Sequence, residues 1–208
     1  MYCSSQHMKR RFLFPLILVP LVESFSVAAQ QTSRLMQDRP APISQGSKWT
    51  EADRKAPLAR ARQGDAGAQF WLGAGYEQGW FGKANFQEAL KWLRRAEAHG
   101  NPDAQVALGQ MYEGGEGVPQ NYVLAAKWYR KAAEHVPDFG GAGQGRNHLG
   151  LLYMQGLGVP KDYVQAYMWF RLTNFETNLS YAKAQMTPAQ ILQAEQMAAE
   201  WKSQHPGR

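Results

Sequence analysis

The sequence predicts an all-α protein, a solenoid of about three stacked helix pairs with a capping helix at each end. Three observations support this prediction: one motif recurs along the chain, each copy has helical periodicity, and the composition suits closely packed helices. The chain has 208 residues, and its 20 glycines, 7 tryptophans and 9 tyrosines are many for that length. Self-similarity at a period of about 20–50 residues is typical of repeat architectures.

The recurring motif is Leu-Gly-x-x-Tyr, which begins at Leu72, Leu108 and Leu149. A tryptophan follows each leucine at the same distance of 20 residues, at Trp92, Trp128 and Trp169. The first period is 36 residues and the second is 41, and the five extra residues fall in the segment 136–144 between units. So many identities in one register indicate three copies of one structural unit.

The first half of each unit has the spacing of an amphipathic helix. Ala104, Leu108 and Tyr112 recur every four residues, which places them on one helix face. Gly109 has no side chain, so we expect a second helix to approach closely there. The loop 115–119 (GEGVP) then ends the helix, because glycine adopts left-handed conformations and proline cannot continue a helix.

The second half of each unit is also predicted to be helical. Asn121 and Asp162 precede these second helices and are typical N-caps, as is Asn101 before Pro102 at the start of unit two. We expect Trp128 to fill a gap between helix pairs, and its loss to unfold the protein.

The first thirty residues have the three parts of a secretory signal peptide. The cations Lys9, Arg10 and Arg11 precede an apolar run, 12–22, and the small residues of 26–29 follow it. We expect cleavage after Ala28 or Ala29, because a membrane span needs about 20 apolar residues. Anchoring through residues 12–29 is the alternative. Translation starting at Met8 rather than Met1 also stays open.

Cysteine content and charge exclude several classes of protein. The single cysteine, Cys3, precedes the basic cluster, so the mature chain has no disulfide, no Cys/His zinc site and no lipid-modified cysteine. Removal of the signal lowers the net charge from +6 to about +4. The cations are interspersed with acids on the predicted helices, so nucleic-acid binding is not expected. The polar segment 30–49 is expected to be a flexible leader.

These residues resemble the Sel1-like repeat family, which is related to the tetratricopeptide repeat. The family pattern combines alanines, Leu-Gly, a tyrosine, a Gly-x-Gly-Val loop with Asp/Asn-Tyr, and a tryptophan. Unit two matches nearly throughout, at Ala104, Leu108, Gly109, Tyr112, Gly115, Gly117, Val118, Asn121, Tyr122, Ala125, Trp128 and Ala132. Unit three departs at Gly145 and at 172–173, and unit one has 79–82 (GWFG) in place of the loop.

The resemblance and the repeat register together predict seven segments. They are a signal peptide 1–29, a leader 30–49, an N-terminal capping helix 50–64, repeat one 65–100, repeat two with an insertion 101–144, repeat three 145–175, and a loop with a C-terminal capping helix 176–208. Pro57 is expected to start or kink the first cap. Thr187-Pro188 is expected to begin the last helix.

No catalytic, cofactor or metal motif occurs in the sequence. His99 and His135 end equivalent helices, where a cation suits the helix dipole. His148 lies on the first helix of unit three, and both a surface position and a contact to a ligand stay open for it. The chain is therefore expected not to be an enzyme and to need no cofactor.

A binding surface on the concave side of the first helices is the expectation that remains. Its candidate residues vary while the repeat frame stays fixed: Phe70, Trp71, Gln110, Glu113, Arg146, Asn147 and His148. The resemblance implies an adaptor of the bacterial cell envelope, periplasmic or secreted, with a protein or peptide partner. One alternative is the β-lactam-binding or β-lactam-hydrolysing activity of cysteine-rich relatives, whose cysteine pairs this chain lacks. Another is a peptidoglycan binder that stacks glycans on Trp80 and Phe81.

Overall fold

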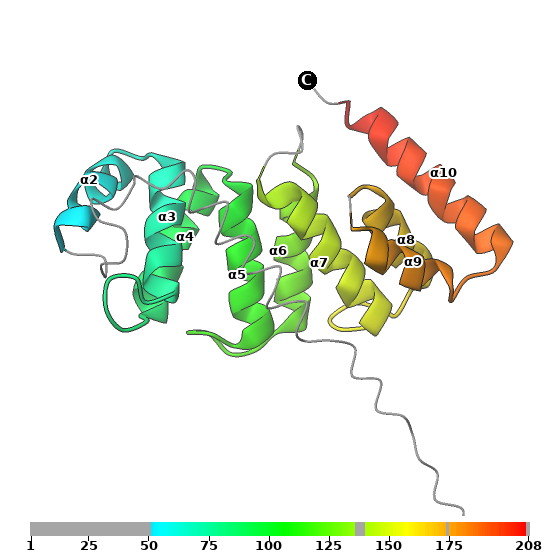
Figure 1. Ribbon diagram of the computed structural model, residues 1–208, viewed down its shortest axis with the longest axis horizontal. Coiled ribbons are helices and arrows are strands. Elements are labelled where there is room, and N and C mark those ends of the chain that lie inside the picture. The colour runs from blue at the N-terminus through cyan, green and yellow to red at the C-terminus, as the bar shows by residue number, and fades with distance from the viewer. Residues whose placement is uncertain (1–50, 136–139, 174, 207–208) are drawn as a thin grey trace, which may run out of the picture. The chain divides into compact units, whose positions relative to one another are not determined.

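The computed structural model describes residues 51–135, 140–173 and 175–206, which belong to one compact unit (Figure 1). Residues 1–50 lie outside that set, so the predicted signal peptide, its cleavage site and the leader 30–49 stay expectations. The described residues form helices and no strand: α2 Glu51–Arg62, α3 Ala66–Glu77, α4 Phe86–Ala98, α5 Pro102–Gly114, α6 Tyr122–Ala133, α7 Gly141–Gln155, α8 Tyr163–Arg171, α9 Glu176–Lys183 and α10 Pro188–Gln204.

The helices pack as the predicted pairs, which confirms the helical solenoid. Helices α3, α5 and α7 are the first helices of their units and pack against the second helices α4, α6 and α8. Each second helix also contacts the first helix of the next unit, α4 with α5 and α6 with α7. Helix α2 contacts α3, and α8 is followed by α9 and α10, which both pack on it (Figure 1).

The predicted helix caps are confirmed. Asn101 and Asn121 accept hydrogen bonds from backbone N–H groups three residues on, and Asp162 accepts two such bonds at the start of α8. Gly115 ends α5 with φ 74°, a left-handed conformation that glycine adopts without strain. Thr187 forms a full capping box with Gln190, and α10 begins there as expected.

The glycine after each motif leucine lies against the second helix of its own unit. A Cβ built on Gly109 would lie 2.5 Å from the Tyr129 ring. The same contact recurs in units one and three, between Gly73 and Leu93 and between Gly150 and Phe170. These contacting side chains come directly after the repeat tryptophans, so one turn of the second helix packs on the glycine in every unit.

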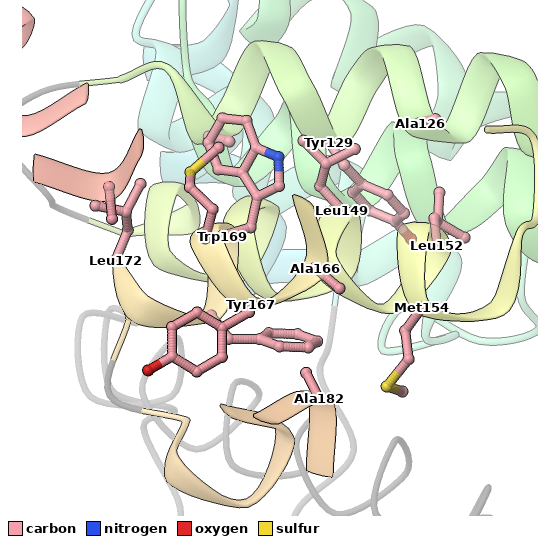
Figure 2. Packing of buried hydrophobic residues seen from close by; sticks show 14 of the residues in the cluster. Ala126, Tyr129, Leu149, Leu152, Met154, Ala166, Tyr167, Trp169, Leu172 and Ala182 are labelled. Carbon is pink, nitrogen blue, oxygen red and sulfur yellow. The ribbon is translucent and has the colours of Figure 1, made fainter. Parts of the chain in front are cut away.

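The largest hydrophobic cluster joins units two and three to the C-terminal helices. Figure 2 shows side chains of α6, α7, α8 and α9 meeting there, among them Tyr129, Leu152, Ala166 and Ala182. Tyr129 and Phe170 are fully buried in the structure. Ala194 and Ala198 of α10 belong to the same cluster. The C-terminal helix therefore closes the hydrophobic core of the last unit.

Two expectations about single residues need correction. Trp128 is only half-buried, and the Lys131 ammonium lies 5.7 Å from its ring centroid, whereas Trp92 and Trp169 are buried. Its loss should therefore cost much less than the loss of a core tryptophan. Pro57 does not begin α2 but lies inside it, so the expectation that it starts the helix is wrong. A kink at Pro57 stays a prediction, because proline inside a helix removes one backbone hydrogen bond.

The aromatic loop of unit one folds back on its own helix. Trp80 and Phe81 are half-buried, with ring centroids 5.6 Å and 5.5 Å from the ring of Trp71. A Cβ on Gly75 would lie 2.5 Å from Phe81. The two rings thus cover α3 at the place where the other units have their Gly-x-Gly-Val loop.

We predict that Gly109→Ala lowers the free energy of unfolding by about 1–3 kcal/mol, because the new methyl group must displace the buried Tyr129 ring. Gly67→Ala is the matched control. It lies in the first turn of α3, where an added Cβ meets only ordinary contacts. Alanine there should be neutral or slightly stabilising. Chemical denaturation measures both, and equal effects would contradict the packing role of Gly109.

Candidate functional site

A polar cluster lies where units two and three meet, and we define it by Gln110, Glu113, Tyr129 and His148. Gln110 and Glu113 belong to the last two turns of α5, Tyr129 to α6 and His148 to α7. Gln110 and Glu113 are three residues apart and share one helix face. The repeat packing therefore brings together side chains that lie up to 38 residues apart in the chain.

The phenol of Tyr129 is the centre of this polar cluster. Its ring is buried against Gly109, and its hydroxyl donates to Glu113 Oε2 at 2.5 Å. The His148 ring stacks on the Tyr129 ring, with centroids 4.6 Å apart and an interplanar angle of 15°. His148 Nε2 lies 3.4 Å from Gln110 Nε2, and its Nδ1 lies 3.9 Å from Glu113 Oε2.

Burial controls the protonation of the polar cluster. The His148 side chain is 16% exposed, and burial lowers its pKa, an effect that the Glu113 carboxylate opposes. Burial also raises the pKa of Tyr129 well above its ordinary value, and nearby Glu113 raises it further. At neutral pH the imidazole and the phenol are therefore uncharged. The Glu113 side chain beside them is 36% exposed.

Glu77 is a second carboxyl group near this site, at the end of α3. It occupies the position of Glu113 in unit one, and its charge acts on the Tyr129 phenol. Burial raises the pKa of Glu77 to about 7, and repulsion from Glu116 adds to the shift. No described residue forms an ion pair with Glu77, so about half of this group is protonated at neutral pH.

The seven candidate residues from the sequence separate into two groups. Gln110, Glu113 and His148 come together in the polar cluster and keep part of their surface exposed. The other four are buried: Phe70, Trp71, Arg146 and Asn147. A side chain that is buried between elements offers little contact area to a partner, so these four have a packing role in this structure.

Arg146 joins four elements. Its Nε donates to the Ala133 carbonyl at 3.0 Å and its Nη2 to the His135 carbonyl at 3.1 Å, at the end of α6. Its Nη1 lies 3.5 Å from the Leu172 carbonyl, and its guanidinium carbon lies 4.6 Å from the ring centroid of Trp201. Carbonyls at helix ends lack intrahelical donors, and Arg146 supplies them.

The same position has a related role in unit one. Gln69 donates from its side-chain amide to the Ala61 carbonyl at 2.9 Å, at the end of α2. Asn147, next to Arg146, accepts a hydrogen bond from Asn178 of α9 at 2.7 Å. These polar groups therefore connect successive elements. The difference in residue type between units at these positions does not show that the side chains have this role.

Tyr129 is the member of the polar cluster that sequence reasoning missed. Its equivalents in units one and three are the apolar residues Leu93 and Phe170, so its position in the repeat does not indicate a polar role. The available signal in the sequence is the hydroxyl group, which the equivalent residues of units one and three lack. A hydroxyl group at a core position of one unit alone requires a buried hydrogen-bond partner.

The described part of the chain has no group of three or more His, Cys, Asp or Glu side chains that could hold a metal ion. Within the same residues, no helix is long and apolar enough to cross a membrane. The arrangement offers hydrogen-bond donors, acceptors and one carboxylate.

Comparisons with known proteins give the family. The Sel1 repeat matches residues 66–101, 102–135 and 144–173. A solved Sel1 repeat protein from Oxalobacter formigenes is 34% identical, over 72% of this chain and 98% of that chain, with a TM-score of 0.49. The chain belongs to the Sel1 repeat family.

A second solved Sel1-type structure is similar in fold. It is a protective antigen of uropathogenic Escherichia coli strains that displays an SLR fold, 31% identical, with a TM-score of 0.69. The match covers 88% of this chain but 39% of the antigen, so this Sel1 repeat protein spans well under half of that relative. No curated protein matches the chain. Sel1 repeats are generally protein-interaction scaffolds and typically not catalytic.

We predict that Glu77→Gln raises the free energy of unfolding by about 1–3 kcal/mol at pH 8 and changes it little at pH 4. The pKa of Glu77 is raised in the folded protein, to about 7 from 4.5, so its protonated form favours folding. That stability is complete below pH 4.5 and is lost as the pH rises through 7. Denaturation at both pH values measures it, with the exposed Glu200→Gln as control. A parent protein and Glu77→Gln variant with parallel pH profiles would contradict this origin.

Proposed function

We propose that the chain is a non-catalytic scaffold of the bacterial cell envelope, which binds a peptide or protein segment on the concave face of its first helices α3, α5 and α7. The observation that supports it is the contact between Gln110 and His148, 3.4 Å apart on neighbouring units. This contact links α5 to α7 and leaves the Glu113 carboxylate partly exposed beside it. A partner would therefore meet polar groups that are already ordered.

The chemistry of the polar cluster suits a polypeptide ligand. Gln110 offers an amide that both donates and accepts, and Glu113 accepts hydrogen bonds from backbone N–H groups or cationic side chains. His148 is fixed by its stack on Tyr129, so little side-chain entropy is lost on binding. Helical repeat proteins use such extended faces for peptides and protein surfaces.

The envelope location rests on two supports. One is the predicted export signal, a basic cluster, short apolar run and small-residue exit. The other is the similarity to a chain described as a protective antigen of uropathogenic Escherichia coli.

Site-specific photo-cross-linking in cells tests the binding face. A photoreactive amino acid at Gln110 should give one discrete protein adduct, because this side chain is at the centre of the proposed face. Gln193, an exposed glutamine on α10, is the matched control and should give none. Adding Glu113→Arg should abolish the adduct. Equal cross-linking at both glutamines, or insensitivity to Glu113→Arg, would refute this binding face.

A further inference from the structure

Charge is segregated between the two layers of helices, contrary to the interspersed pattern expected from the sequence. The second helices α4, α6 and α8 carry seven cations, which are Lys91, Arg94, Arg95, Lys127, Arg130, Lys131 and Arg171. They carry two acids, Glu88 and Glu97. The first helices have the opposite balance, with the acids Glu77, Asp103 and Glu113 and the buried Arg146.

The cations lie on the side of the second helices that faces away from the core. In α4, Lys91, Arg94 and Arg95 are exposed at helical spacing, whereas Trp92 and Leu93 between them are buried. Lysines recur at the equivalent positions of neighbouring helices. Lys127 of α6 is the equivalent of Lys91, and Lys55 precedes Lys91 by the same 36 residues, on α2.

We define the basic face by five exposed residues on four helices: Lys55, Lys91, Arg94, Lys127 and Arg171. Intramolecular pairing neutralises little of it. Lys91 pairs with Glu88 three residues away at 3.2 Å, with its side chain still 52% exposed. Within the described residues, Lys55, Arg94 and Lys127 form no ion pair. Such exposed pairs and unpaired cations keep most of their charge available.

Some cations of the same helices already have partners, and they define the limits of the basic face. Arg130 donates to the Tyr153 hydroxyl at 2.7 Å, and the guanidinium of Arg95 lies 4.8 Å from the centroid of Trp92. Lys131 bridges from α6 to Glu97 of α4. Arg130 and Lys131 link neighbouring helices and Arg95 covers Trp92 of its own helix, whereas the five residues of the basic face are exposed.

We propose that the basic face binds the surface of an anionic lipid bilayer. Its charges are single, exposed and distributed over successive helices, without an enclosing pocket or a fork of paired arginines for one phosphate. Charge complementarity of this diffuse kind suits a surface that presents many anionic headgroups at once. Recognition of single-stranded nucleic acid would in addition require stacking aromatic side chains, and the exposed tyrosine of the described residues, Tyr181, lies on α9.

This arrangement would leave the first helices accessible. Because the basic face and the polar cluster lie on different helix layers, a protein partner and a bilayer would not compete for the same residues. Among the helices α3 to α8 the exposed cations lie on the second helices, so attraction to anionic headgroups favours one orientation of the bound protein.

Vesicle co-sedimentation tests this proposal, with protein recovered after expression of the full chain. Vesicles of phosphatidylcholine alone are compared with vesicles that contain an equal amount of phosphatidylglycerol, at about 50 mM and about 300 mM sodium chloride. We expect binding that requires phosphatidylglycerol and weakens at the higher salt concentration. The triple variant Lys55→Ala, Lys91→Ala, Lys127→Ala should lower the partition coefficient about tenfold to a hundredfold, because each lysine near an anionic surface contributes to the binding and three are removed.

The matched control removes the same charge from other exposed positions: Lys161→Ala, Lys183→Ala and Lys202→Ala. It should retain most of the binding, and circular dichroism should show both triple variants folded. A parent protein that does not distinguish the two vesicle types would overturn the proposal. Equal losses in the two triple variants would overturn it as well, because net charge would then explain the binding. The Gln110 cross-link depends on neither result.

Discussion

The contact between a glycine of the first helix and the side chain that follows the tryptophan of the second helix determines how every unit is built. It occurs at Gly73, Gly109 and Gly150 with Leu93, Tyr129 and Phe170. A side chain at the glycine would hold the two helices apart, and the next first helix packs on both of them. The distance within one pair therefore fixes the position of the following pair. The identity of the contacting residue is free to vary within this geometry, as long as it fills the space.

The polar cluster is a variation on that contact. In unit two the side chain on the glycine is a tyrosine, so the same buried ring carries a hydroxyl to Glu113 and offers its face to His148. The packing contact and the proposed binding face thus share one residue. Precise placement of His148 and Gln110 follows from core packing, because the ring that supports them cannot move without disturbing the helix pair. This is how a regular repeat can hold an irregular site.

The repeat frame could be predicted because its signals are local: motif spacing, N-caps, glycine turns and the opening Thr187-Pro188. The exposure of individual side chains could not be predicted, because it depends on neighbouring residues from other units. Arg146 is buried among the end of α6, Leu172 and Trp201 of α10, and no spacing within unit three predicts these contacts. Trp128 matches its equivalents in sequence and differs in burial. Charge segregation was missed for a related reason, because cations and acids alternate along the chain and separate only when helices are sorted into layers.

Arg146 also has a consequence for the length of the array. Its unit-one equivalent, Gln69, binds one carbonyl of the preceding helix, which any neighbouring unit can offer. Arg146 in addition reaches forward to Leu172 and lies under Trp201, so its geometry includes the helix that closes the stack. A further unit inserted after α8 would take the place of α10 and remove this partner. Arg146 therefore suits only the last unit of the array. Additional units would be accommodated more easily before unit three than after it.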